Sequence, residues 1–221
     1  MEIMKQCSTA NTTVCKNRKI EYIVIHYTAG TSSTPGKAAS TAKYFANEST
    51  KASADFIVDD ANVVQFNQDI PNRYTWHCGG AKLKTQGGQY YNKCTNKNSI
   101  GIEICSNNVH KKVLDANDES WYFTDEAVAL AAELVRELMK RYGIPVGNVI
   151  RHYDVTGKLC PGIYGWNIDS CDEAEWDDFK SRIAEHPDEA DAPCNADYDE
   201  LLQKYEELKA KYDAIVEIIN S

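Results

Sequence analysis

The chain has 221 residues, of which 43% are apolar and 26% are charged, values typical of a globular protein with a substantial core. Its formal net charge of -9 argues against a nucleic-acid partner, because a phosphate backbone repels an acidic surface. No stretch reaches the roughly 20 consecutive apolar residues that span a bilayer, so we expect no membrane span. A polymeric partner must then be held in a groove rather than by bulk charge.

Seven segments, each a strand, a hairpin or a helix, are predicted in chain order. They are a buried strand at 20–27, a helix at 37–47, a hairpin at 55–59 and 62–66, a buried strand at 99–105, a helix at 124–142, a short strand at 149–152 and a helix at 173–184. The helix at 124–142 has the clearest ends, with Thr124 as N-cap and Gly143 just after its last turn. The pattern predicts an α/β fold with a mixed central β-sheet flanked by helices.

A long segment rich in Gly, Asn, Lys and Tyr, residues 76–98, predicts a surface loop between the hairpin and the second buried strand. The eight cysteines include no Cys-x-x-Cys pair, and residues 1–19 lack the apolar core of a secretory signal. We therefore expect synthesis in the cytoplasm, with most thiols free, and Cys105 packed in the core.

The composition changes near residue 186, which predicts a globular domain at 1–185, a Pro-rich acidic linker at 186–196 and a C-terminal helix at 197–221. Apolar side chains recur every seven residues at two adjoining positions of that helix, formed by Leu201, Leu208 and Ile215 and by Tyr205, Tyr212 and Ile219. This repeat predicts a coiled coil that forms a homodimer through 197–221. The alternative is one amphipathic helix packed on the domain.

Three residues of metal-binding type stand out. His26 ends the first buried strand, while His152 and Cys160 are eight residues apart in a segment with Gly and Pro that can turn both side chains toward one point. Two imidazoles and a thiolate are good zinc ligands, and three protein ligands leave a fourth position for water, as in catalytic sites. Taken singly, each residue has an ordinary alternative, namely a core histidine, a surface histidine and a free thiol.

Five stretches of the sequence together carry a family resemblance: IVIHYTAG at 23–30, SADFIVDD at 53–60, TWHCGG at 75–80, NSIGIEICSN at 98–107 and RHYDVTGKLCPG at 151–162. In this order they resemble the zinc-dependent N-acetylmuramoyl-L-alanine amidases of type 2, the family of phage lysins and the peptidoglycan-recognition fold. The resemblance covers residues 21–183. It implies that His26, His152 and Cys160 bind Zn²⁺.

The same resemblance implies roles for three further residues. Glu103 matches the catalytic base of some branches, Lys158 matches the lysine that faces the scissile carbonyl, and His77 matches a position that lines the substrate groove. Some members carry a tyrosine in the hairpin strand, where this chain has Ala54 or Asp55. That departure favours Glu103 as the residue that activates water, and it leaves the role of Asp55 open.

The function expected from these observations is zinc-dependent hydrolysis of the amide bond between N-acetylmuramic acid and L-alanine in bacterial peptidoglycan. With cytoplasmic synthesis, the expected protein is a phage or prophage endolysin that reaches the wall through a holin lesion. The alternatives are a non-catalytic peptidoglycan-binding module, a cytoplasmic amidase that recycles wall fragments, and a structural zinc or disulfide protein. The last of these requires a fourth ligand or paired cysteines, and the sequence offers neither.

Overall fold

The computed structural model describes residues 2–78, 88–167 and 173–184, all of which lie in one compact unit, Met1–Ala184. The predicted linker at 186–196 and the predicted coiled coil at 197–221 lie outside the described residues, as does the middle of the predicted loop at 76–98. The domain boundary, the linker and the coiled coil therefore stay predictions.

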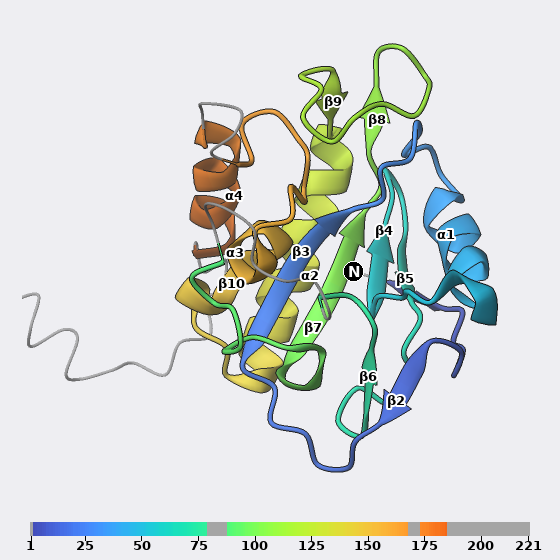
Figure 1. The fold of residues 1–221 in the computed structure, drawn as a ribbon, viewed down its shortest axis with the longest axis vertical. Coiled ribbons are helices and arrows are strands. Elements are labelled where there is room, and N and C mark those ends of the chain that lie inside the picture. Colours follow the sequence, from blue (N-terminus) through green and yellow to red (C-terminus); the bar gives the residue numbers. More distant parts are fainter. Residues whose placement is uncertain (1, 79–87, 168–172, 185–221) are drawn as a thin grey trace, which may run out of the picture. The chain divides into compact units, whose positions relative to one another are not determined.

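A six-stranded sheet forms the centre of the described chain, in the order β1-β5-β4-β7-β3-β10 (Figure 1). Its strands are β1 (Ile3–Lys5), β3 (Tyr22–Tyr27), β4 (Phe56–Val58), β5 (Val63–Gln65), β7 (Ser99–Ile104) and β10 (Val149–Arg151). Neighbouring strands are parallel except for β4 and β5, which form an antiparallel hairpin. The predicted mixed sheet, the two buried strands and the hairpin are confirmed.

The helices flank this sheet. They are α1 (Lys37–Phe45), α2 (Asp125–Tyr142), α3 (His152–Thr156) and α4 (Ala174–Ala184), with 3-10 turns η1 (Glu48–Thr50), η2 (Asn96–Asn98) and η3 (Val146–Asn148). Helix α2 begins and ends at the predicted residues. At its start, the Thr124 hydroxyl accepts a hydrogen bond from Ala127 N, and after its last turn Gly143 takes up the left-handed conformation at φ 66°. No helix in the described ranges has both the length and the apolar character needed to cross a bilayer.

The two faces of the sheet are covered by different parts of the chain. Ile23 and Ile25 of β3 and Ile102 of β7 pack in the large core that includes α2, which runs along one face in Figure 1. The side chains that alternate with them point to the opposite face. Because β3 and β7 are in register, His26 lies beside Glu103 on that opposite face. The strand alternation thus turns both polar residues away from the α2 core.

Several short elements depart from the sequence prediction. The polar N-terminus contributes β1 to the central sheet and β2 (Thr12–Val14), which pairs with β6 (Arg73–Thr75) in a separate antiparallel ribbon. A second ribbon joins β8 (Asn107–Asn108) and β9 (Trp121–Tyr122). Helix α3 occupies part of the segment predicted to be a loop between His152 and Cys160. These elements are two to five residues long, too short to leave a periodic pattern in the sequence.

Candidate metal centre

Two neighbouring parallel strands and the segment after α3 bring the three predicted ligands to one place. His26 is the second-last residue of β3, and His152 directly follows β10, whose Arg151 pairs with Ile25 of β3. Cys160 comes shortly after the end of α3. All three side chains are buried, and one ligand atom from each lies within 4.8 Å of the other two. The structure therefore brings together the residues that the sequence singled out.

The spacing and the unpaired atoms of this cluster fit a zinc ion. The Cys160 Sγ lies 3.6 Å from the His26 Nδ1. Sulfur and nitrogen ligands at zinc bond lengths in a tetrahedral arrangement are about 3.6 Å apart. Both ring nitrogens of His152 are buried without a hydrogen-bond partner. Burying an imidazole in this way is costly unless another partner, such as a metal ion, takes its lone pair.

The protonation states of the cluster follow from burial. Burial is the main reason that the pKa of His26 lies well below its ordinary value, and the nearby His152 lowers it further. Burial, together with the charge of Lys158, lowers the pKa of His152 to about 3. Both imidazoles are therefore neutral, which is the form that binds metal ions. Burial raises the pKa of the Cys160 thiol to about 12. A cation at the site would favour the thiolate, so metal binding would release this proton.

Glu103 stands beside the cluster in a strand interior. Its Oε2 is shielded from solvent and has no hydrogen-bond partner. Burial raises the pKa of this carboxyl to about 8, against the opposing charge of Lys158. Lys158 itself is exposed, two residues before Cys160. The site thus joins a desolvated carboxyl group, poised to exchange protons near neutral pH, to a nearby ammonium group.

His77, expected to line the substrate groove, contacts His26, one of the three candidate metal ligands. Its Nδ1 lies 3.1 Å from the His26 Nε2, and its Nε2 lies 3.1 Å from the Ser99 Oγ. Ser99 was not among the site residues predicted from the sequence. Its only signal in the sequence is its place at the start of the second buried strand, two residues before a glycine.

A buried ion pair, also missed at the sequence level, fixes the start of α3. The Asp154 Oδ2 accepts from the Arg151 backbone N at 2.8 Å and from its Nε at 3.0 Å, while Oδ1 accepts from Nη2 at 2.8 Å. The Arg151 Nη1 also donates to the Trp166 carbonyl and to the Glu173 carboxylate. Because His152 lies between Arg151 and Asp154 in the sequence, this ion pair fixes the backbone conformation at His152.

Asp55, whose role the sequence left open, is fully buried and away from the ligands. Its carboxylate accepts from the Asn67 Nδ2 at 2.7 Å, the Thr75 Oγ1 at 2.8 Å and the Gly101 N at 2.8 Å. These bonds join the hairpin to β6 and β7. Asp55 therefore ties the sheet together under the site and has its carboxylate occupied by protein donors.

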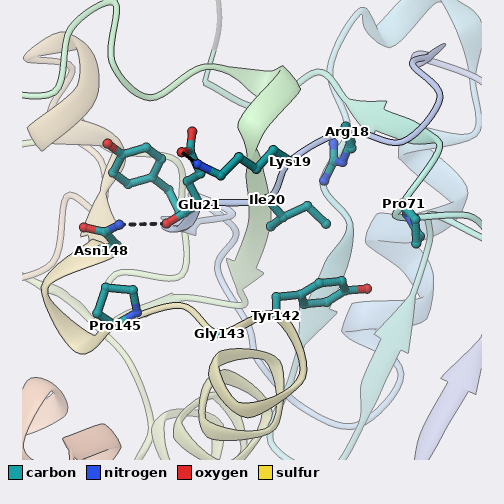
Figure 2. Close-up of a pocket in the computed structure, with 10 residues that line it drawn as sticks. Arg18, Lys19, Ile20, Glu21, Pro71, Tyr142, Gly143, Pro145 and Asn148 are labelled. Carbon is teal, nitrogen blue, oxygen red and sulfur yellow. Dashed lines mark hydrogen bonds and ion pairs between the residues drawn. The ribbon is translucent and has the colours of Figure 1, made fainter.

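A cavity of about 540 Å³ opens at the opposite ends of the same strands (Figure 2). Its lining includes Arg18, Glu21, Tyr142, Pro145 and Asn148, none of which contacts the His/His/Cys cluster. In Figure 2 the Asn148 amide donates to the Glu21 carbonyl across this cavity, at 2.9 Å. The chemistry-bearing residues and this cavity are therefore separate features.

The fold and the site define an α/β protein with a three-ligand candidate metal centre at the carboxyl ends of its central parallel strands. More narrowly, the chain belongs to the N-acetylmuramoyl-L-alanine amidase family, whose model matches residues 16–163. The matched range contains all three ligand candidates together with Glu103 and Lys158.

Individual relatives agree with this assignment. The chain is 36% identical over 152 residues to the N-acetylmuramoyl-L-alanine amidase CwlA of Bacillus subtilis (strain 168), covering 66% of this chain and 45% of the relative. It is 32% identical over 164 residues to XlyB of the same organism, covering 74% and 42%. The solved catalytic domain of XlyA is similar with a TM-score of 0.58 and 28% identity, covering 83% of this chain and 99% of that one.

A mutant endolysin from Bacillus subtilis gives a TM-score of 0.57 at 29% identity, covering 82% of this chain and 98% of that chain. The chain spans less than half the length of the curated relatives named above. The likeness to solved structures, by contrast, runs over nearly all of each structure. The part shared with XlyA is therefore nearly the whole of its solved catalytic domain.

Proposed function

We propose that this chain hydrolyses the amide bond between N-acetylmuramic acid and L-alanine in bacterial peptidoglycan, as a zinc-dependent endolysin. One observation carries the proposal: His26, His152 and Cys160 converge in a buried cluster in which both nitrogens of His152 lack partners, with Glu103 beside it. Membership of the amidase family supports the substrate class. Because the net charge is -9, affinity for this polymer must come from local contacts rather than from bulk charge.

The chain's own residues divide the reaction among them. His26, His152 and Cys160 would hold the zinc ion, which supplies Lewis acidity toward the carbonyl and lowers the pKa of a water to about 7. Glu103 takes a proton from the attacking water and passes it to the nitrogen of the leaving L-alanine. Lys158 places its ammonium group near the developing oxyanion and stabilises it. The partial desolvation of Glu103 keeps its pKa close to the working pH.

Digestion of purified peptidoglycan sacculi tests the proposal directly. We expect mass analysis to find free stem peptides with an N-terminal alanine, together with intact glycan strands, and metal analysis to find one zinc ion per chain. Cleavage should cease on chelation and return when Zn²⁺ is added. Binding to sacculi without release of stem peptides would contradict the enzyme and favour a non-catalytic module.

The substrate form separates an endolysin from a recycling amidase. An endolysin cuts intact sacculi, whereas a recycling enzyme prefers small soluble muropeptides. We expect faster cleavage per bond in sacculi, and lysis of host cells only when the protein is co-expressed with a holin. A strong preference for soluble fragments would contradict the endolysin assignment.

We also propose that residues 197–221 join two chains as a coiled coil, since their apolar residues repeat every seven positions. Two catalytic units on one polymer would raise avidity without new contacts. Sedimentation of the full chain against one ending at residue 188 tests this. A dimer is expected for the first and a monomer for the second, and equal monomeric masses would contradict the proposal.

A further inference from the structure

We propose that His77 is a positioning residue for the metal ligand His26, and that a hydrogen-bond chain ending on a backbone carbonyl selects the tautomer of His26 that can bind metal. The inference rests on the proposed metal site and deepens it. The chain runs from the His26 Nε2 to the His77 Nδ1 at 3.1 Å, then from the His77 Nε2 to the Ser99 Oγ at 3.1 Å. It ends where the Ser99 hydroxyl donates to the Thr95 carbonyl at 2.6 Å.

The carbonyl at the end of this chain sets the direction of every bond in it. A carbonyl oxygen only accepts, so the single hydroxyl hydrogen of Ser99 is used on Thr95. The Ser99 oxygen must then accept from the His77 Nε2–H. A neutral His77 with its proton on Nε2 offers a lone pair at Nδ1, which accepts from the Nε2–H of His26. With its proton on Nε2, His26 has its lone pair on Nδ1.

That lone pair points to the proposed metal position. The His26 Nδ1 lies 3.6 Å from the Cys160 Sγ, so this nitrogen faces the other ligands. The opposite tautomer would place a hydrogen on Nδ1 and direct it at the cluster, where it blocks metal binding. A hydrogen bond from the second nitrogen of a histidine ligand commonly fixes its tautomer and ring orientation. Here that bond goes to a histidine whose own proton is fixed by Ser99.

The sheet is shaped to hold His77 in place. A Cβ atom added to Gly101 of β7 would lie 2.5 Å from the His77 Cγ, so the imidazole lies directly on the strand backbone where a side chain is absent. The backbone N of His77 donates to the Asn96 Oδ1 at 3.0 Å. The His77 ring meets the His26 ring edge-on, with an interplanar angle of 90°. Both ring nitrogens are used inside the protein, so His77 has no ring nitrogen left for a substrate.

Zinc affinity of the full chain, measured by competition with a chromophoric chelator, tests the proposal. His77→Phe keeps a ring of similar size but removes the acceptor, and we expect zinc to bind about 10–100-fold more weakly. His77→Asn offers an oxygen near the position of Nδ1, and it should recover most of the affinity. Ser99→Ala should fall between them. Cys105→Ala is the matched control, because Cys105 is a buried thiol in a separate core cluster, and this variant should bind zinc as the unaltered chain does.

Nitrogen-15 NMR of the zinc-free chain adds a readout that a purely structural role would not move. The unaltered chain should show His26 protonated at Nε2, and His77→Phe should show a mixture of tautomers. Unchanged affinity and tautomer in His77→Phe would overturn the proposal. So would equal losses of zinc affinity in His77→Phe, His77→Asn and Cys105→Ala, if those losses followed the thermal stability of the variants. If the unaltered chain bound no zinc, the proposed function would fail, while the tautomer of His26 would still decide this inference. Should His77→Phe not fold, Ser99→Ala carries the same test.

Discussion

The two ends of the central strands differ in how their polar groups are satisfied. At the carboxyl ends, His152 has neither ring nitrogen paired and Glu103 has a shielded, unpaired oxygen. At the amino ends, beside the cavity of about 540 Å³, the Glu21 carboxylate accepts from Lys19 and Asn98, and its carbonyl accepts from the Asn148 amide (Figure 2). Although its Nε has no partner, Arg18 donates from its two terminal nitrogens to the carbonyls of Asn96 and Ser99.

The difference teaches that unpaired groups, rather than volume, locate the chemistry in this protein. A cavity whose lining groups are mostly paired loses little when it holds only water. A buried imidazole without a partner is costly, and it is retained where a ligand supplies the missing contact. Substitutions at the two ends should therefore have very different consequences for catalysis.

The largest effect is expected for Cys160→Ser, because a hydroxyl replaces the thiolate and the site loses a strong zinc ligand. We expect the chain to lose bound zinc and, with it, several kcal/mol of transition-state stabilisation, a drop of about 10³-fold or more in kcat/KM. Metal analysis and sacculus digestion measure the two losses. Cys105→Ala is the matched control, since this buried thiol packs in another core cluster and should keep zinc. Full zinc content in Cys160→Ser would remove Cys160 from the ligand set.

Glu103→Gln should leave the metal in place and remove the proton transfer. The amide is nearly isosteric with the carboxyl group but cannot accept the water's proton, so we expect kcat to fall about 10²–10⁴-fold. Zinc content should be unchanged, and thermal stability should not fall, because Oε2 makes no hydrogen bond to lose. Near-normal turnover in sacculus digestion would show that another group acts as the base.

The sequence predicts the parts of the fold that carry long, regular patterns. The strands β3 and β7 are continuous apolar runs, and α2 has an N-cap at Thr124 and a glycine at its end, so both kinds of element were predicted nearly to the residue. Strand β2 is only Thr-Thr-Val, and its partner β6 comes some sixty residues later, so tertiary pairing creates both. Helix α3 depends on the Arg151–Asp154 pair rather than on helical periodicity.

Site residues were predictable where motifs carried them, and their mutual contacts were not. His26, His152 and Cys160 could be chosen by residue type and family pattern. The pairing of His26 with Glu103 depends on the register of two strands far apart in the sequence, which no local pattern encodes. The contact of His77 with His26 likewise depends on how β6 and the segment after it cross Gly101.

The third prediction concerns stability, and it compares a buried ion pair with an exposed one. Asp154→Ala leaves the Arg151 guanidinium buried without its main partner, so we expect the free energy of unfolding to fall by about 3–5 kcal/mol. Urea unfolding of the zinc-free chain measures this. The matched control is Glu137→Ala, which breaks the exposed pair with Arg141 and should cost less than about 1 kcal/mol. Similar losses in the two variants would contradict a supporting role for the buried pair.

The smallest effect is expected at the cavity. Tyr142→Phe removes a hydroxyl from the cavity wall without touching the ligands, and the side chain is only half-buried. We expect kcat/KM on sacculi within about twofold and a change in unfolding free energy within about 0.5 kcal/mol. A tenfold loss of activity with full zinc content would show that the cavity helps to hold the substrate. Both ends of the strands would then act on the substrate, because binding remote from the reacting bond can lower the barrier at that bond.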